Sequence, residues 1–295
     1  MRVNPNPLAD LLSALNHTQQ QITNDLGQIA SGQRVNTPAD DPAAAATLVR
    51  NADQTSADDQ YLRSIASVQG ELQNADSALS SVVTALQRAI SLGTEGANGT
   101  LNDSDRQALA GEVKGIQSQI LGLANLSYQG RYVFAGTATQ TAPFVADSTS
   151  SSGVRYIGNN GVNQLTVGDH TFLQTNMPGS QLFSGGGNDM FQAVQDVVNA
   201  LESNGDVASA VNKLSGAYEH INAQRVFFGN TINQLNAQQS YLNSESTQLE
   251  QQSNQVGGAE LPRAISDLTN AQTSRQATLE AIAQTQQTNL FNYIK

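Results

Sequence analysis

The sequence predicts a mainly α-helical protein with a small β domain, built as a long antiparallel helical bundle closed by its N- and C-terminal helices. Two observations carry this prediction. Apolar residues recur at steps of three and four near both ends of the chain and through its long central segments, as amphipathic helices require. Between residues 131 and 187 the apolar period changes to two, which is typical of strands.

The two terminal helices are predicted from one apolar stripe each. The first helix is expected over residues 8–31, with a stripe made of Leu8, Leu11, Leu15, Thr18, Ile22, Leu26 and Ile29. The last is expected over residues 261–294, with a stripe made of Leu261, Ile265, Leu268, Leu279, Ile282 and Leu290. Neither helix can bury its stripe alone, so each needs a partner. Gln272, Arg275 and Gln286 interrupt the second stripe and weaken a simple two-helix pairing.

A connector of ten residues, 32–41, follows the first helix. Gly32 is a suitable residue for ending that helix, and Asp41 is expected to cap the next one, with Pro42 at its first position. Arg34 and Asp40 have no such local explanation. For these two residues an ion pair and a contact with another subunit both remain open.

The central helices have long heptad-like patterns. The second helix begins near residue 43, and its pattern over residues 61–90 indicates a helix roughly 70 Å long. The glycine-rich stretch 93–99 is expected to end it, and a third helix returns from a cap at Asp103 or Ser104. Two further helices are expected over residues 190–201 and 206–254, before Gly257-Gly258 breaks the pattern.

The β segment contains four candidate strands, at residues 131–135, 154–157, 162–167 and 170–174. Gly158-Asn159-Asn160-Gly161 contains the Asn-Gly pair of a tight turn, so we expect the second and third strands to form a hairpin. The Ser-rich stretch 147–153 is expected to be mobile.

Composition excludes several classes of protein. The net charge is −11, with 14 Lys and Arg against 25 Asp and Glu, so no basic stripe exists for nucleic acid or an anionic membrane. Cysteine is absent, which excludes disulfides and thiolate metal sites. No apolar run is long enough to span a membrane, and no cleavable secretory signal precedes the first helix. Charged residues are only 13% of the chain, which hints at a surface meant to be covered.

No pattern of catalytic residues emerges. The three histidines, His17, His170 and His220, lie far apart and have no metal-ligand spacing. The run Gly185-Gly186-Gly187 has no lysine after it, so we interpret it as a linker and not a phosphate loop. We therefore expect no catalytic residues, no cofactor and no metal site.

One string carries a specific resemblance. Residues 26–41 resemble the end of the first helix of bacterial flagellins, L-x-x-L-x-S-G-x-R-[IV]-N-x-x-x-D-D. The matching residues are Leu26, Ser31, Gly32, Arg34, Val35, Asn36, Asp40 and Asp41. Gly130-Arg131-Tyr132-Val133-Phe134-Ala135-Gly136, followed by Pro143-Phe144, is similar to the branch of this family that joins the flagellar hook to the filament.

This resemblance implies a domain division and a set of partners. Residues 1–42 and 258–295 would form a terminal coiled-coil segment in the core of a tubular polymer. Residues 43–130 and 188–257 would form the helical bundle, and residues 131–187 an outer β-rich domain. The partners would be further copies in a ring, a sister hook-associated protein, flagellin and an export chaperone, and export would follow the flagellar type III route to an extracellular site. The intersubunit contact candidates are Arg34, Asn36, Asp40, Asp41, Leu15, Ile22, Leu268, Leu279, Ile282 and Leu290.

Three alternative functions remain. The chain is compatible with a filament-forming flagellin, although the string 130–136 is unusual in those proteins. A coiled coil of a chemoreceptor or phage tail would need a membrane span or a trimeric heptad, and neither is found. An enzyme would need a convergent set of catalytic residues, which the sequence does not offer.

Overall fold

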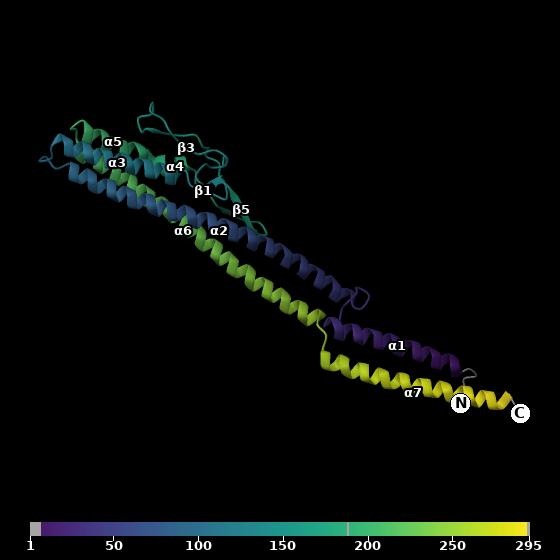
Figure 1. Cartoon of the computed structure of the whole chain (residues 1–295). Helices are drawn as coiled ribbons and strands as arrows, with labels where there is room; N and C mark the ends of the chain where they lie inside the picture. Colours follow the sequence, from purple (N-terminus) through teal and green to yellow (C-terminus); the bar gives the residue numbers. More distant parts are fainter. Residues whose placement is uncertain (1–6, 188, 294–295) are drawn as a thin grey trace. The chain divides into compact units, whose positions relative to one another are not determined.

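The computed structural model describes residues 7–187 and 189–293, most of which are helical (Figure 1). The chain divides into two compact units. The terminal unit comprises the residues up to Ala57 and from Ser244 onward, and the central unit comprises Asp58–Asn243. The predicted class, mainly α with a small strand-containing segment, is confirmed.

The terminal unit contains α1 (Pro7–Ser31) and α7 (Leu261–Tyr293), which lie side by side (Figure 1). α1 ends where Gly32 takes a φ of +69°, a conformation that favours glycine. The chain then pairs with the segment before α7, since Gln33 forms an antiparallel bridge with Gly258 and the Ala259 N–H donates to the Gly32 carbonyl. These contacts join the two points at which the long helices break.

Four helices build the central unit: α2 (Pro42–Gly96) and α6 (Val207–Gly257), each of which starts or ends in the terminal unit, with α3 (Asp103–Ala124) and α5 (Met190–Glu202). Their predicted apolar positions are buried or half-buried. The fully buried leucines and isoleucines of α2 and α3 are Ile65, Leu72, Leu79, Leu86, Leu92 and Ile120. Polar pairs cross this core at its rim, and Arg225 on α6 meets both carboxylate oxygens of Asp76 on α2 at 3.0 and 3.1 Å.

The turn between α2 and α3 differs in one detail from the prediction. Asn102 caps α3, because its side chain accepts a hydrogen bond from the Asp105 N–H at 2.9 Å. The expected caps, Asp103 and Ser104, are instead the first two residues of the helix. Asn, Asp and Ser are nearly equivalent caps, so a run of three such residues leaves the boundary open by one position.

Three short antiparallel hairpins form the β segment. β1 (Ser127–Tyr128) pairs with β2 (Arg131–Tyr132), β3 (Phe144–Ala146) with β4 (Val154–Tyr156), and β5 (Gln164–Gly168) with β6 (Thr171–Gln174). The expected hairpin between residues 154–157 and 162–167 is therefore wrong. Two short connecting elements, α4 (Gly179–Ser184) and the 3₁₀ turn η1 (Gly185–Gly187), lead into α5.

Asn159 explains why that hairpin does not form. Its side-chain oxygen accepts hydrogen bonds from the Thr137 and Gly161 N–H groups at 2.8 and 3.0 Å. Its own N–H donates to the Ala135 carbonyl at 3.2 Å. The turn signal at residues 158–161 thus anchors the loop after β2, where Gly136 has a φ of +69° and a Cβ would lie 2.2 Å from the Asn159 carbonyl oxygen.

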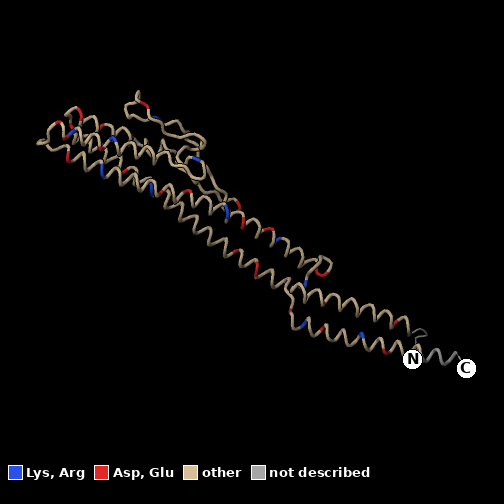
Figure 2. Tube along the Cα trace, viewed as in Figure 1, with Lys and Arg blue, Asp and Glu red and all other residues tan. Residues whose placement is uncertain are grey.

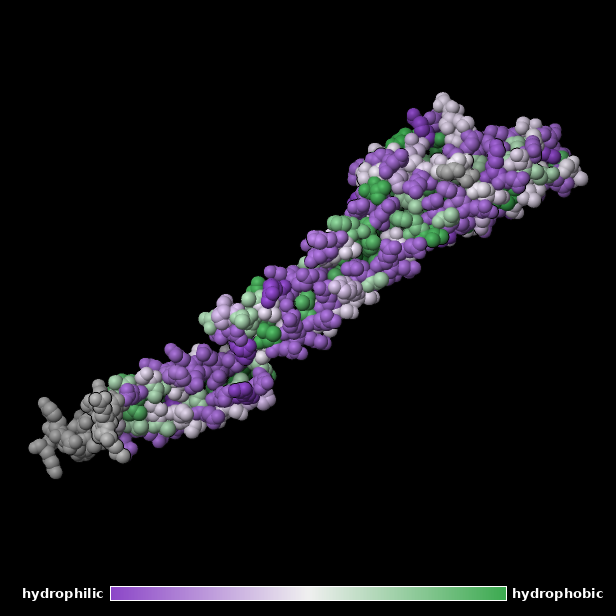
Figure 3. Space-filling view, turned by 180° about the vertical axis from the view of Figure 1, so that it is seen from behind, coloured by the Kyte–Doolittle hydropathy of each residue, from purple (hydrophilic) through white to green (hydrophobic). Residues whose placement is uncertain are grey.

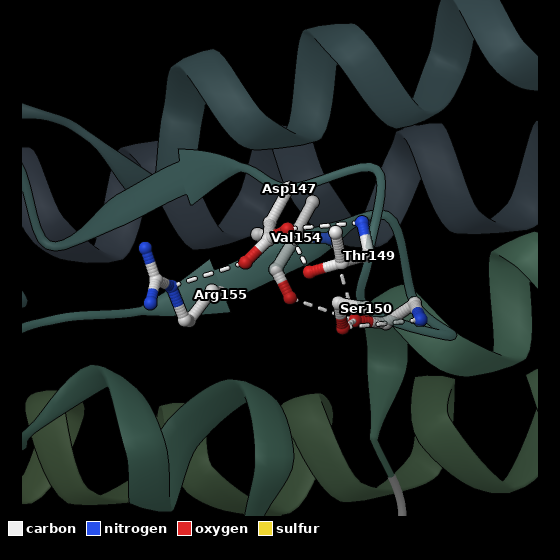
Figure 4. A network of polar contacts seen from close by, with 6 residues as sticks. Asp147, Thr149, Ser150, Val154 and Arg155 are labelled. Carbon is white, nitrogen blue, oxygen red and sulfur yellow. Dashed lines mark hydrogen bonds and ion pairs between the residues drawn. The ribbon is translucent and has the colours of Figure 1, made fainter.

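The loop between β3 and β4 is tied by hydrogen bonds, in contrast to the mobile stretch that its serines suggest (Figure 4). The Asp147 carboxylate accepts from the N–H and the hydroxyl of Thr149 at 3.0 and 2.6 Å, and it forms an ion pair with Arg155 at 3.2 Å. The backbone closes the loop, since the Asp147 N–H donates to the Gly153 carbonyl at 2.9 Å. Serine enrichment therefore marks a hydrogen-bonded turn here.

Candidate functional site

The face of α1 that packs on α7 follows the predicted stripe for most of its length. Thr18 and Ile22 are buried, at 8% and 5% exposure, and Leu15 is half-buried. Leu26 was expected in this stripe, but it is 49% exposed. Each step of four residues rotates the stripe by about 40°, so two such steps after Thr18 turn the side chain away. Asp25 occupies the half-buried position instead.

The face of α7 that packs on α1 differs from the predicted stripe. Ala264 and Ala271 are buried, at 5% and 6% exposure, and Thr278 and Thr285, each seven residues further on, are half-buried. We call these four residues the small face. Small side chains let α7 approach the larger Leu15 and Ile22 side chains of α1.

The large apolar residues of α7 therefore remain partly uncovered. Leu261, Ile265 and Leu279 are 44%, 52% and 44% exposed, and we call these three residues the exposed stripe. Leu268 lies between the two faces, Ile282 lies on the side of the small face, and both are half-buried. Fully burying a leucine or isoleucine is worth about 1.5–3 kcal/mol, so covering the remaining half of each member would contribute about 1 kcal/mol. Leu290, also predicted in this stripe, has a side chain outside the described residues.

Charge is sparse on this helix pair. α1 contains two acidic residues, Asp10 and Asp25, and no lysine or arginine (Figure 2). Figure 3 shows apolar atoms in green among the polar ones on the helices next to the grey terminal residues. A surface with partly uncovered leucines and few charges has little electrostatic barrier to contact with another protein.

Asp25 weakens the pairing of α1 with α7. Burial raises the pKa of its carboxyl group, and the nearby Asp267 carboxylate on α7 raises that pKa further. The ionised carboxyl thus has an unfavourable place in the contact at neutral pH. A helix pair with small residues on one side and an acidic residue on the other is only weakly stabilised within one chain.

Arg34 binds within its own chain. Its Nη2 atom lies 3.2 Å from an Asp41 carboxylate oxygen and 2.8 Å from the Val256 carbonyl oxygen at the end of α6. The backbone N–H of Arg34 donates to the Gly257 carbonyl at 2.7 Å. Arg34 thus binds the connector, residues 32–41, to the C-terminal end of α6. Of the two roles expected for Arg34, the structure shows the ion pair, with Asp41.

Asp41 is the cap of α2, as predicted. Its carboxylate accepts from the Ala44 N–H at 3.1 Å. This hydrogen bond, followed by the one from Arg34, lowers the pKa of Asp41 below its usual value.

Asp40 closes the turn that precedes α2. Its carboxylate accepts from the Thr37 and Asn36 N–H groups at 2.8 and 3.0 Å, and these bonds lower its pKa. The Asn36 side chain donates to the Gln33 carbonyl at 3.1 Å. Arg34, Asn36 and Asp40 also line an open polar cleft beside the end of α1, so their outer faces remain available to a partner.

Over residues 7–187 and 189–293, no group of three or more His, Cys, Asp or Glu side chains is placed to hold a metal ion. No described helix is long and apolar enough to cross a bilayer.

Comparison with known proteins shows a similarity to flagellar proteins. The family model described as the bacterial flagellin N-terminal helical region matches residues 5–139. The flagellar hook-associated protein 3 of Escherichia coli (strain K12) is 28% identical over 294 residues, which cover 91% of each chain. Over the matched residues, this chain is similar to the bacterial flagellins. The resemblance seen in residues 26–41 is thus confirmed.

Two further proteins are similar to this chain over most of its length. The flagellin of Listeria innocua is 24% identical over 98% of this chain and 96% of its own length. A solved structure of a putative flagellar hook-associated protein from Vibrio parahaemolyticus has the same fold, with a TM-score of 0.68 at 24% identity, over 74% of this chain and all of its own. The higher identity of the E. coli protein, 28% against 24%, favours the hook-associated branch over flagellin.

The small face and Asp25 are the features of this chain that sequence reasoning missed. The small face has a signal in the sequence, because Ala264, Ala271, Thr278 and Thr285 recur every seven residues. The large residues Ile265 and Leu279 lie one position away and offer a competing stripe. Small residues are a common signal of close helix contact, and here that signal decides the register.

Proposed function

We propose that this chain is a structural adaptor of the bacterial flagellum that joins the hook to the flagellin filament and is required for filament assembly. The observation that supports this most directly is the similarity to a hook-associated protein 3 along nine-tenths of both chains. The uncovered apolar residues of α7 fit the role, since an adaptor must present surface that its neighbours complete.

The terminal helices would supply the contact between subunits. Covering Leu261, Ile265 and Leu279 with a neighbouring copy would contribute about 3 kcal/mol per subunit, at about 1 kcal/mol for each half-exposed side chain. This amount is too small to hold a dimer in dilute solution, because association costs at least about 4 kcal/mol. Such contacts become sufficient when each subunit binds several neighbours in a ring at the same time and the binding energies combine.

The finer assignments follow from the same role. The ring of copies would contact a sister hook-associated protein on the hook side and flagellin on the filament side. An export chaperone would cover α7 before assembly, and the type III route would deliver the chain to the outside of the cell. The core domain would consist of residues 1–42 and 258–295, and the bundle domain of residues 43–130 and 188–257. The outer domain would consist of residues 131–187. The candidates in the connector, Arg34, Asn36, Asp40 and Asp41, would contact neighbours through their outer faces.

Electron microscopy of cells that lack this chain tests the proposal. The expected result is hooks without filaments, together with flagellin monomers in the medium. Expression of the chain from a plasmid should restore filaments. Normal filaments on the deletion strain would overturn the adaptor role.

A second candidate, the filament subunit itself, has a flagellin match over 98% of the chain in its favour. The two functions separate in a strain that lacks flagellin but expresses this chain in excess. A filament subunit would form long filaments there, whereas an adaptor would leave the hooks bare.

A further inference from the structure

The turn between α2 and α3 holds one of three Asn-Gly pairs in the chain. These pairs are Asn98-Gly99, Asn160-Gly161 and Asn204-Gly205. Deamidation of such a pair begins when the glycine amide nitrogen attacks the side-chain carbonyl carbon of the asparagine. Glycine favours this attack because it has no Cβ and reaches many backbone conformations. The local structure then decides which pair reacts.

In two of the pairs the glycine N–H, whose nitrogen would attack, donates a hydrogen bond. The Gly205 N–H donates to the Ala200 carbonyl at 2.8 Å. The Gly161 N–H donates to the side-chain oxygen of Asn159 at 3.0 Å. An amide engaged in this way must first break its hydrogen bond before it can lose its proton and attack.

The Asn160 side chain is also fixed. Its oxygen accepts a hydrogen bond from the Ser180 hydroxyl. Gly161 packs closely as well, since a Cβ there would lie 2.4 Å from the Thr137 hydroxyl oxygen. The backbone movement that ring closure requires is therefore restricted at this pair.

Asn98-Gly99 has the opposite environment. Both residues are exposed, and no atom lies within 4 Å of a Cβ built on Gly99. No hydrogen bond from the Gly99 amide is present in the described part of the chain. The attacking nitrogen is thus free, and its surroundings leave room for the turn to close into a ring.

Thr100 also prepares the group under attack. The side-chain oxygen of Asn98 accepts from the Thr100 N–H at 3.2 Å and from the Thr100 hydroxyl at 3.0 Å. This oxygen gains negative charge when the nitrogen adds to the neighbouring carbon. Donors already aimed at an oxygen where charge develops stabilise the transition state, as in the oxyanion holes of enzymes.

We propose that Asn98 is a site of spontaneous deamidation, promoted by Thr100. The Gly99 nitrogen loses its proton to water and forms a bond to the Asn98 side-chain carbonyl carbon. The bond from that carbon to the side-chain nitrogen then breaks, and the nitrogen takes up a proton and leaves as ammonia. Water opens the resulting five-membered succinimide at either carbonyl, which gives an aspartyl or an isoaspartyl residue at position 98.

The product changes the turn in two ways. It adds a negative charge between Glu95 and Asp103, which already make this end of the helix pair acidic. The isoaspartyl form also lengthens the backbone by one atom, which disturbs the hydrogen bond from the Leu101 N–H to the Asn98 carbonyl at 3.3 Å. Ageing of the chain would therefore alter the α2–α3 turn first.

Peptide mapping by mass spectrometry tests this proposal on the folded full chain, incubated in mildly alkaline buffer and sampled over time. Position 98 should deamidate at least about tenfold faster than positions 160 and 204. In chemical denaturant the three rates should approach one another. Comparable rates at the three positions in the folded chain would overturn the proposal.

Two matched variants isolate the role of Thr100. Thr100→Val keeps the side-chain shape and removes the hydroxyl donor, so deamidation at position 98 should slow by about fivefold, the effect of one hydrogen bond of ordinary strength. Thr94→Val removes a hydroxyl that donates to the Ile90 carbonyl one turn earlier in α2, and it should leave the rate unchanged. An unchanged rate in Thr100→Val would show that the oxyanion contact is wrong.

Discussion

The exposed stripe of α7 can be removed without disturbing the packed face of the same helix. The variant Ile265→Ala with Leu279→Ala deletes two side chains that are 52% and 44% exposed. In the free chain this should change the stability of the α1–α7 pair by less than about 1 kcal/mol, as for most surface substitutions. In the assembled state the lost burial is about 1 kcal/mol for each side chain, or about 2 kcal/mol per subunit. Binding of one subunit to its neighbours should weaken by about thirtyfold.

Ile22→Ala provides the matched control on the packed face. Ile22 is 5% exposed, and truncation of a buried isoleucine to alanine costs about 2–5 kcal/mol. This variant should therefore loosen the α1–α7 pair in the free chain, which the double variant leaves intact. The two variants distinguish a surface used between subunits from a surface used within one chain.

Two readouts are needed. Amide hydrogen exchange on the purified chain reports the stability of α1 and α7. Electron microscopy of complemented deletion cells, with immunoblots of the medium, reports assembly and export. The double variant should be exported, and its amides in α1 and α7 should be protected from exchange as in the wild type. It should form few filaments. Loss of protection equal to that in Ile22→Ala, or a normal number of filaments, would refute the reasoning.

Four other predictions concern both units of the chain. In the free chain, amides of α1 and α7 should exchange faster than those of the central unit, whose helices bury far more apolar side chains; uniform exchange would contradict this. Gly136→Ala should lower the thermal stability of the central unit by about 1–3 kcal/mol, because a Cβ there meets the Asn159 carbonyl oxygen, and an unchanged melting curve would count against it. Because the pKa of Asp25 is raised, acidification from neutral pH should protonate this carboxyl and tighten the α1–α7 pair. Asp40 and Asp41 have lowered pKa values, so their stabilising contribution persists down to about pH 3.9 and is lost below it, which exchange measurements in a pH series would detect.

Periodicity predicted the helices well, because it reports a property of each helix alone. α1 and α7 begin within one residue of the predicted first residues, Leu8 and Leu261. The Asp41 cap could also be predicted from the sequence. A carboxylate directly before a proline at the first helical position commonly caps the helix.

Pairing between elements was harder to predict, because it depends on contacts distant in sequence. The turn at residues 158–161 has a hairpin signature, yet the Asn159 side chain bonds to Thr137, about twenty residues earlier. On α7 the choice between two stripes depends on which side chains α1 offers, and the large Ile265 and Leu279 side chains masked the small face. Sequence patterns show that a helix has an apolar side, but the partner decides which side is packed.

Thiol labelling offers the most direct test of the central claim, that the exposed stripe of α7 is covered in the assembled flagellum. The chain has no cysteine, so Leu279→Cys introduces a single reactive thiol, and Ser148→Cys in the exposed β3–β4 loop serves as the control. Maleimide should label both variants in the free chain. In isolated flagella the thiol at position 279 should be protected, while the one at position 148 remains reactive. Equal labelling of position 279 in free and assembled protein would contradict the account.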